Sequence, residues 1–102
     1  MVILRDDLDK LPFASDALPP VTPGEVLREE YMTPLGLSAR ALASEIGVPP
    51  NRITEILRGE RAITAATAIL LGRRFNTSSR FWMNLQVAHD LAVAERGMPH
   101  TA

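Results

Sequence analysis

The spacing of apolar residues predicts helices almost without interruption from Thr22 onward. Thr22 begins a Thr-x-x-Glu capping box, and Pro23 occupies the first helical position, where its missing N–H costs no hydrogen bond. We expect this first helix to run to about Met32 and to be ended by Pro34 and Gly36.

The next two predicted helices are separated by a turn of only a few residues. Ser38 is a good N-cap for the first of them, and Gly47 follows it where a left-handed residue is expected. Pro50 can open the other, and Gly59 ends it. The apolar residues of each helix fall on one side, which predicts one buried face per helix. These residues are Ala39, Leu42, Ala43 and Ile46 in the first, and Ile53, Ile56 and Leu57 in the second.

Two further helices follow. Thr64 caps the fourth, whose end is marked by Asn76, a residue that tolerates the left-handed conformation. Its inward residues are Ala68, Leu71 and Phe75. Thr77 or Ser78 caps a fifth helix over residues 79–96. Because no segment alternates like a strand for more than a few residues, the pattern predicts an all-α fold of five helices.

The first 21 residues show no sustained helical period and contain three prolines, which predicts an irregular N-terminal arm. Either the arm packs loosely on its own domain or it becomes ordered on a partner. The predicted organisation is therefore an arm over residues 1–21, one helical domain over residues 22–97, and a tail over residues 98–102.

The second and third helices carry the functional signal. Gly47 lets the chain reverse tightly, Val48 fills the angle between the helices, and Ile53 holds the third helix across the second. This is the arrangement of a helix-turn-helix, which leaves the outer face of its second helix free to enter a major groove of DNA.

Several polar residues on or beside that outer face are candidate DNA contacts, because Asn can read adenine and Arg can read guanine or bind phosphate. The candidates are Ser38, Arg40, Pro50, Asn51, Arg52, Thr54, Glu55, Arg58 and Arg61. Of these, Arg58 and Arg61 suit phosphates at the end of the helix. Glu55 either pairs with Arg52 or Arg58 within the helix or accepts a hydrogen bond from a cytosine amino group.

Charge is distributed unevenly along the chain, although the net formal charge is only −1. Residues 1–33 carry seven acidic and three basic side chains, a net of −4. Residues 34–75 carry six Arg against three Glu, a net of +3, and this block coincides with the helix-turn-helix. The basic block suits DNA and the acidic block suits a basic protein. Because +3 is modest, each monomer should bind DNA weakly and need dimerisation.

The fifth predicted helix carries two apolar stripes, more than a terminal helix of so small a domain usually buries by itself. We therefore expect a homodimer interface on this helix. Its predicted residues are Phe81, Trp82, Leu85, His89 and Val93.

Nothing in the sequence indicates catalysis, a metal or a cofactor. Cysteine is absent, which excludes disulfides and thiolate zinc sites, and His89 and His100 have no metal-like spacing. No Ser-His-Asp order or Gly-rich phosphate loop occurs, so we expect neither an enzyme nor a small-molecule substrate. With no apolar run of the ~20 residues that span a membrane and no secretory signal, we expect a cytoplasmic protein without membrane contact.

Over about residues 22–91 the chain resembles the HigA/VapI-type antitoxins of the Cro/C1-like (XRE) helix-turn-helix superfamily. The motifs that carry the resemblance are Pro23-Gly24-Glu25, Leu35-Gly36-Leu37-Ser38, Ala41-Leu42-Ala43, Ile46-Gly47-Val48-Pro49, Arg52-Ile53, Glu55-Ile56, Gly59-Glu60-Arg61-Ala62-Ile63-Thr64, Thr77-Ser78-x-x-Phe81-Trp82-x-Asn84-Leu85-Gln86 and Asp90-Leu91. The resemblance implies a five-helix lambda-repressor-like fold and a homodimer that represses its own operon by binding palindromic operator DNA. It also implies a HigB-like toxin partner, a ribosome-associated mRNA endonuclease that the antitoxin neutralises.

The chain departs from the pattern at three positions. Ala39 stands where the superfamily often has a Gln that supports DNA contacts, so that contact is lost and Arg40 is the candidate to replace it. His89 stands where the branch usually has Tyr, and Asn76 where Gly is common.

Two other functions remain open from the sequence: an XRE-type transcriptional regulator without a toxin, and a protein-interaction module that does not bind DNA and uses its acidic N-terminal third. A gel shift with the protein's own promoter separates the second from the others. A short basic reading frame immediately upstream indicates a toxin.

Overall fold

The computed structural model describes residues 21–98. Within this range all the regular secondary structure is helical. In chain order the segments are α2 (Pro23–Val26), η1 (Leu27–Met32), α3 (Thr33–Leu35), α4 (Ala39–Ile46), α5 (Pro50–Leu57), α6 (Ala65–Phe75) and α7 (Ser79–Gly97). Because α2, η1 and α3 form one unbroken helix, these residues contain five helices and no strand, which confirms the predicted fold class. The predictions for residues 1–20 and 99–102 lie outside the described part of the chain.

The first helix is longer than the sequence predicted. It passes through Pro34 and ends only at Gly36, whose φ is 65°. In an α-helix a proline ring clashes with the carbonyl four residues earlier and donates no hydrogen bond. Here the preceding six residues form a π-helix, in which the Thr33 N–H bonds to the Arg28 carbonyl five residues back. This wider turn alters the spacing around Pro34, so the helix continues for one more turn.

Side-chain caps begin the helices as the sequence predicted. In each case a hydroxyl oxygen accepts a hydrogen bond from a backbone N–H three residues later. The capping residues are Thr22, Ser38, Thr64 and Ser78. Asn76 ends α6 with a φ of 57°, as expected for a left-handed terminator. These local signals fix where four of the five helices begin.

The core lies where the first helix, α4, α5, α6 and the start of α7 meet. Its fully buried apolar residues are Leu27, Met32, Leu42, Ala43, Ile53, Ile56, Ile63, Ala68, Leu71 and Trp82. Aromatic rings surround Trp82, including Tyr31 with its centroid 5.0 Å away and Phe81 at 5.1 Å. The indole N–H also donates to the Thr77 hydroxyl oxygen at 2.7 Å.

The burial of Trp82 corrects one predicted interface residue. Its side chain is 0% exposed within a single chain, so it cannot contact a second protomer. The reason is that Tyr31 of the first helix covers the indole ring, which places this part of α7 in the core.

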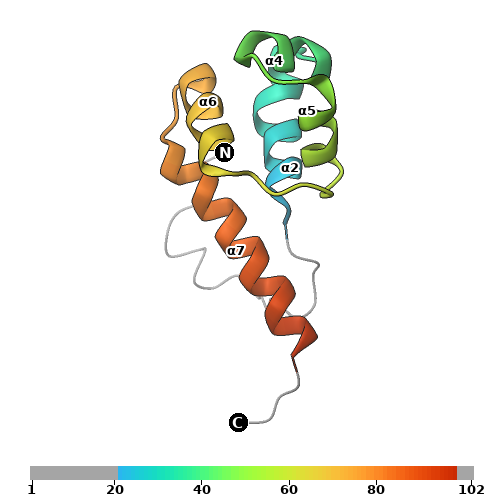
Figure 1. Cartoon of the computed structure of the whole chain (residues 1–102), viewed down its shortest axis with the longest axis vertical. Coiled ribbons are helices and arrows are strands. Elements are labelled where there is room, and N and C mark those ends of the chain that lie inside the picture. Colours follow the sequence, from blue (N-terminus) through green and yellow to red (C-terminus); the bar gives the residue numbers. More distant parts are fainter. Residues whose placement is uncertain (1–20, 99–102) are drawn as a thin grey trace.

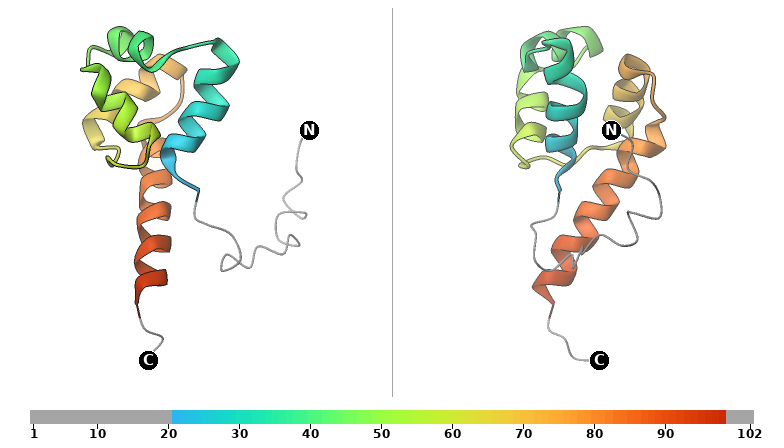
Figure 2. Two further views of the ribbon diagram at one scale, coloured as in Figure 1. Left: turned by 90° about the vertical axis from the view of Figure 1, so that its right-hand side faces the viewer. Right: turned by 180° about the vertical axis from the view of Figure 1, so that it is seen from behind.

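Helix α7 has two dissimilar halves. Its first half packs against α6, whereas its second half extends away from the other helices, as Figures 1 and 2 show from three directions. No residue from Val87 to Met98 is buried. The second half therefore presents apolar side chains that no other described residue covers.

Gly24 permits the closest approach between the first helix and α5. A Cβ atom at this position would lie 2.2 Å from the Ile56 carbonyl oxygen and 2.9 Å from the Leu57 Cα. Both are backbone atoms, which cannot move aside as a flexible side chain could. The absence of a side chain at Gly24 thus sets how the C-terminal end of α5 seats on α2.

We predict that Gly24→Ala lowers the free energy of unfolding by about 1–3 kcal/mol, because the added methyl group overpacks this contact. Urea denaturation followed by circular dichroism measures the change. Gly97→Ala is the matched control, since a Cβ at Gly97 meets nothing within 4 Å. An equal effect from both substitutions contradicts the steric explanation.

Candidate nucleic-acid interface

A tight turn joins α4 to α5. Gly47 adopts a φ of 76°, which only glycine occupies without strain. The N–H groups of Gly47 and Val48 both bond to the Ala43 carbonyl, at 2.9 and 3.0 Å, and so close the end of α4. Pro49 is extended, and α5 begins at Pro50. The two helices form the helix-turn-helix that the sequence predicted, and Figure 1 shows them beside the first helix.

Burial of one side of α5 determines which side chains face outward. Ile53 and Ile56 are buried, and Leu57 is half-buried. Asn51 and Arg58 are therefore exposed. The structure brings the predicted candidates on this helix onto its outer and flanking sides, with Arg52, Thr54 and Glu55 half-buried.

The remaining candidates surround this face. Ser38, Arg40, Pro50 and Arg61 are all exposed. The Ser38 hydroxyl caps α4 by accepting the Ala41 N–H at 3.0 Å. The Thr54 hydroxyl donates to the Pro50 carbonyl at 3.1 Å, which uses its proton but leaves lone pairs free.

Glu55 has a partner that the sequence did not indicate. Its Oε1 atom accepts a hydrogen bond from Arg61 Nε at 2.6 Å, and both side chains are partly exposed. The two residues stand six apart, across the left-handed turn at Gly59. Because exposed ion pairs contribute only about 0–1 kcal/mol to stability, this pair mainly orients the two side chains.

The loop that carries Arg61 is fixed at its far end. The Ile63 side chain is buried, and its N–H donates to Gln86 Oε1 at 2.7 Å. Gln86 Nε2 in turn donates to Asp90 Oδ1 at 2.9 Å. Sequence reasoning gave Gln86 no role beyond the family motif. The available signal was a glutamine on the inner side of α7, one turn before an aspartate.

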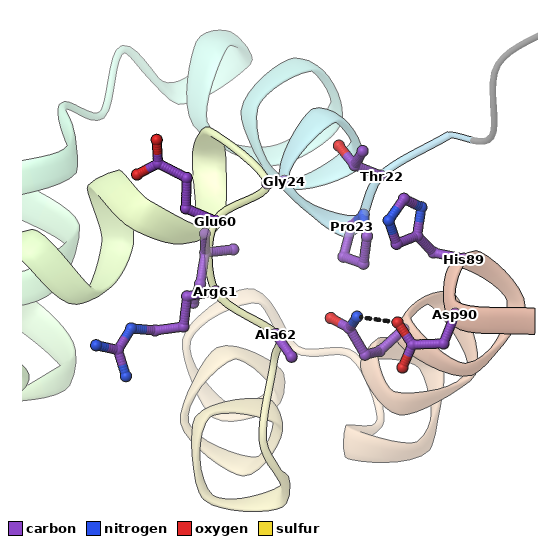
Figure 3. A pocket seen from close by; sticks show the side chains of 11 residues that line it. Thr22, Pro23, Gly24, Glu60, Arg61, Ala62, His89 and Asp90 are labelled. Carbon is purple, nitrogen blue, oxygen red and sulfur yellow. Dashed lines mark hydrogen bonds between the residues drawn. The ribbon is translucent and has the colours of Figure 1, made fainter. Parts of the chain in front are cut away.

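A cavity of about 210 Å³ lies beside this loop. Figure 3 shows it between the start of α2, the loop and the middle of α7, with His89 and Asp90 on one side and Glu60 and Arg61 on the other. His89 Nδ1 is buried and has no hydrogen-bond partner among the described residues.

Ion pairs engage part of the basic block. Arg61 pairs with Glu55, and Arg74 pairs with Glu45 and lies over the Phe75 ring. Within residues 21–98, no ion pair involves Arg52 or Arg58. Arg52 on α5 and Arg58 directly after it thus remain available to an anionic partner.

Residues 21–98 contain neither a metal-ligating cluster nor a membrane-spanning helix. No group of three or more His, Asp or Glu side chains could hold a metal ion. No helix there is both long and apolar enough to cross a membrane.

A polar helix held outward on a tight turn by buried isoleucines defines a helix-turn-helix DNA-binding protein. In agreement, the family model described as "Helix-turn-helix" matches residues 28–82. The chain belongs to this XRE-type family and, within it, to the HigA/VapI-type antitoxins. These are DNA-binding regulators and antitoxins, not enzymes, as the sequence predicted.

One similar protein and two similar structures support this placement. Virulence-associated protein I of Dichelobacter nodosus is 49% identical over 86 residues, which cover 84% of this chain and 80% of that protein. The structure of PA4674 from Pseudomonas aeruginosa with its 18-bp operator DNA is 42% identical, with a TM-score of 0.76 over 78% of this chain and 86% of that chain. The structure of Pseudomonas aeruginosa antitoxin HigA with the higBA promoter is 38% identical, with a TM-score of 0.72 over 81% of this chain and 99% of that chain.

Proposed function

We propose that this protein binds operator DNA in its own promoter as a homodimer and neutralises a HigB-like toxin. The observation that carries the proposal is the outer face of α5 and its C-cap Arg58: within residues 21–98, Arg52 and Arg58 enter no ion pair, and Asn51 is exposed. Two similar structures, those of PA4674 and of antitoxin HigA from Pseudomonas aeruginosa, contain operator or promoter DNA.

Base recognition falls to the start of α5. In helix-turn-helix proteins, the N-terminal residues of the second helix contact base edges in the major groove. Asn51 and Arg52 occupy the second and third positions of α5, next to the exposed Pro50. Their amide and guanidinium groups match adenine and guanine respectively. Thr54 lies one turn further on, where its hydroxyl oxygen can accept a hydrogen bond from a base edge.

Phosphate contacts fall to residues around this face. Arg58 and Arg61 follow the end of α5, and Ser38 and Arg40 lie at the start of α4. Glu55 holds Arg61 by an ion pair, so its role here is to orient a phosphate-binding arginine. A carboxylate engaged in this way is also less repelled by the DNA backbone.

The second half of α7 supplies the dimer interface in this proposal. Of the predicted interface residues in this half, Val93 is exposed and His89 is half-buried; Phe81 and Leu85 lie in the first half and pack against the core. Three further apolar side chains are exposed there: Val87 by 51%, Leu91 by 57% and Met98 by 66%. Val87 and Leu91 follow a spacing of i and i+4, which places them on one side of the helix, and Met98 directly follows its last residue. Pairing this stripe with a second copy removes it from water.

The toxin surface follows from the acidic block. Glu25, Glu29 and Glu30 are exposed on the first helix, and the predicted toxin is a basic RNase. Opposite charges on two partners speed their encounter and fix their register. The first helix, together with residues 1–21, is the proposed docking surface.

Co-expression with the neighbouring reading frame tests the antitoxin function. The proposal predicts that the two proteins co-purify and that this protein restores growth. A deletion of residues 1–21 tests the arm: equal neutralisation by the shortened protein means that the arm is not needed. Absence of both co-purification and growth rescue, with promoter binding intact, favours a regulator without a toxin.

We predict that Asn51→Ala or Arg52→Ala weakens promoter binding and relaxes base preference by roughly 1–3 kcal/mol, because a base-edge contact is lost. Fluorescence anisotropy against promoter duplexes with single base changes measures both effects. Arg73→Ala, an exposed arginine on α6, is the matched control. If affinity and preference match those of the unaltered protein, these residues do not read bases.

Arg61→Ala should weaken binding to all sequences alike, because a phosphate contact carries no base information. The slope of log K against log salt is negative, and its magnitude should fall by about 0.9 for each lost contact, so a lower slope means a smaller magnitude. Binding titrations over a salt series, on promoter and scrambled duplexes, give both quantities. A change confined to one base position contradicts the phosphate role.

Leu91→Asp should raise the dimer dissociation constant by roughly 10- to 100-fold, since it places a charge in the apolar stripe. Sedimentation equilibrium measures this constant. Ile69→Asp, at an exposed apolar position on α6, controls for an added charge. Dimers that persist unchanged in Leu91→Asp exclude this half of α7 as the interface.

A further inference from the structure

We infer that Gln86 is a positioning residue for Arg61, acting through the loop between α5 and α6. This inference rests on the proposed DNA-binding function, in which Arg61 contacts a phosphate. It assigns a part in DNA binding to a residue on α7, the helix that otherwise supplies core and interface.

The Gln86 side chain is fully engaged. It is only 8% exposed, its Oε1 accepts the Ile63 N–H at 2.7 Å, and its Nε2 donates to Asp90 Oδ1 at 2.9 Å. An ionised carboxylate only accepts hydrogen bonds, so Asp90 selects the nitrogen of the amide. The oxygen is thereby directed toward Ile63. A dashed line in Figure 3 marks the hydrogen bond that Asp90 accepts.

The loop itself is held at its two ends. At the α5 end, the Gly59 N–H bonds to the Ile56 carbonyl at 3.0 Å, and the Glu60 N–H bonds to the Glu55 carbonyl at 2.9 Å. At the α6 end, Ile63 is buried and bonded to Gln86. Arg61 lies between these two anchors and is itself exposed.

Loss of the Gln86 anchor therefore frees the backbone next to Arg61 and leaves a buried N–H without a partner. The Glu55 carboxylate can still pair with the guanidinium, but an exposed ion pair on a loose loop constrains its position poorly. The consequence is loss of the phosphate contact, with the base-reading residues of α5 undisturbed.

The experiment measures the salt dependence of binding by the full chain to a duplex from its own promoter, between about 50 and 200 mM salt. We expect Gln86→Leu to reduce the magnitude of the negative slope of log K against log salt by about 0.9, as Arg61→Ala does. The double variant should show no further decrease, and base preference should not change. Asn84→Leu, at an exposed position of the same helix, is the control and should retain the full slope.

Amide hydrogen exchange in the free protein supplies a readout that needs no DNA. The Ile63 amide should exchange at least about tenfold faster in Gln86→Leu than in the unaltered protein. If Gln86→Leu does not fold, Asp90→Ala serves instead, because Asp90 is exposed. Asp90→Ala should speed the exchange of this amide and lower the slope, whereas Asp90→Asn, which keeps an oxygen acceptor for Gln86 Nε2, should restore both.

The outcomes separate this inference from the proposed function. If Arg61→Ala lowers the slope and Gln86→Leu does not, the inference is overturned and the proposed function stands. A slope lower in the double variant than in either single variant also overturns it, because the two residues then act independently. If Arg61→Ala itself leaves the slope unchanged, the phosphate assignment fails and the inference fails with it.

Discussion

Burial of one side of α5 is the constraint on which the rest of the structure depends. Ile53 and Ile56 lie fully inside the core, and each such side chain contributes about 1.5–3 kcal/mol when removed from water. The left-handed Gly47 sets the angle at which α5 leaves α4, and Gly24 lets the first helix approach the other end of α5. Because both ends and one side of α5 are fixed, the direction of its polar face is fixed as well. On this face Glu55 pairs with Arg61, whereas Arg52 enters no ion pair within residues 21–98.

Helix α7 divides its length between two tasks. Its first half completes the core through Trp82 and bonds to the loop between α5 and α6 through Gln86. Its second half carries uncovered apolar residues. A single helix thus connects the loop that carries Arg61 to the surface that we propose for dimerisation. Gln86, which bonds to the loop, and Leu91, on the proposed dimer surface, lie close together along α7.

Local signals in the sequence predicted most of the fold. Ser and Thr caps, Gly47 and Asn76 act within a few residues of themselves, so the starts of α4, α6 and α7 and the ends of α4 and α6 follow from them. The first helix was predicted too short because a proline normally ends an α-helix, and a π-helical turn before Pro34 was not foreseeable from residue preferences. Trp82 was assigned to an interface because a stripe alone does not reveal which helix covers it.

The contacts of the site were harder to predict than its location. The polar outer face of α5 followed from its helical period and the buried isoleucines. The Glu55–Arg61 pair crosses a turn, outside the three- and four-residue spacings that sequence rules consider. The bond from Gln86 to Ile63 joins residues 23 apart in the chain. Such contacts depend on how the helices pack, which composition and periodicity do not specify.

A methylation-protection footprint on the protein's own promoter tests the central claim most directly, because dimethyl sulfate reports on guanine N7 in the major groove and adenine N3 in the minor groove. Two copies of α5 on one dimer predict two protected clusters on one face of the DNA, with centres about one helical turn (~10 bp) apart. Protection restricted to the minor groove, or a single cluster without a symmetric partner, contradicts a dimer that reads DNA through α5.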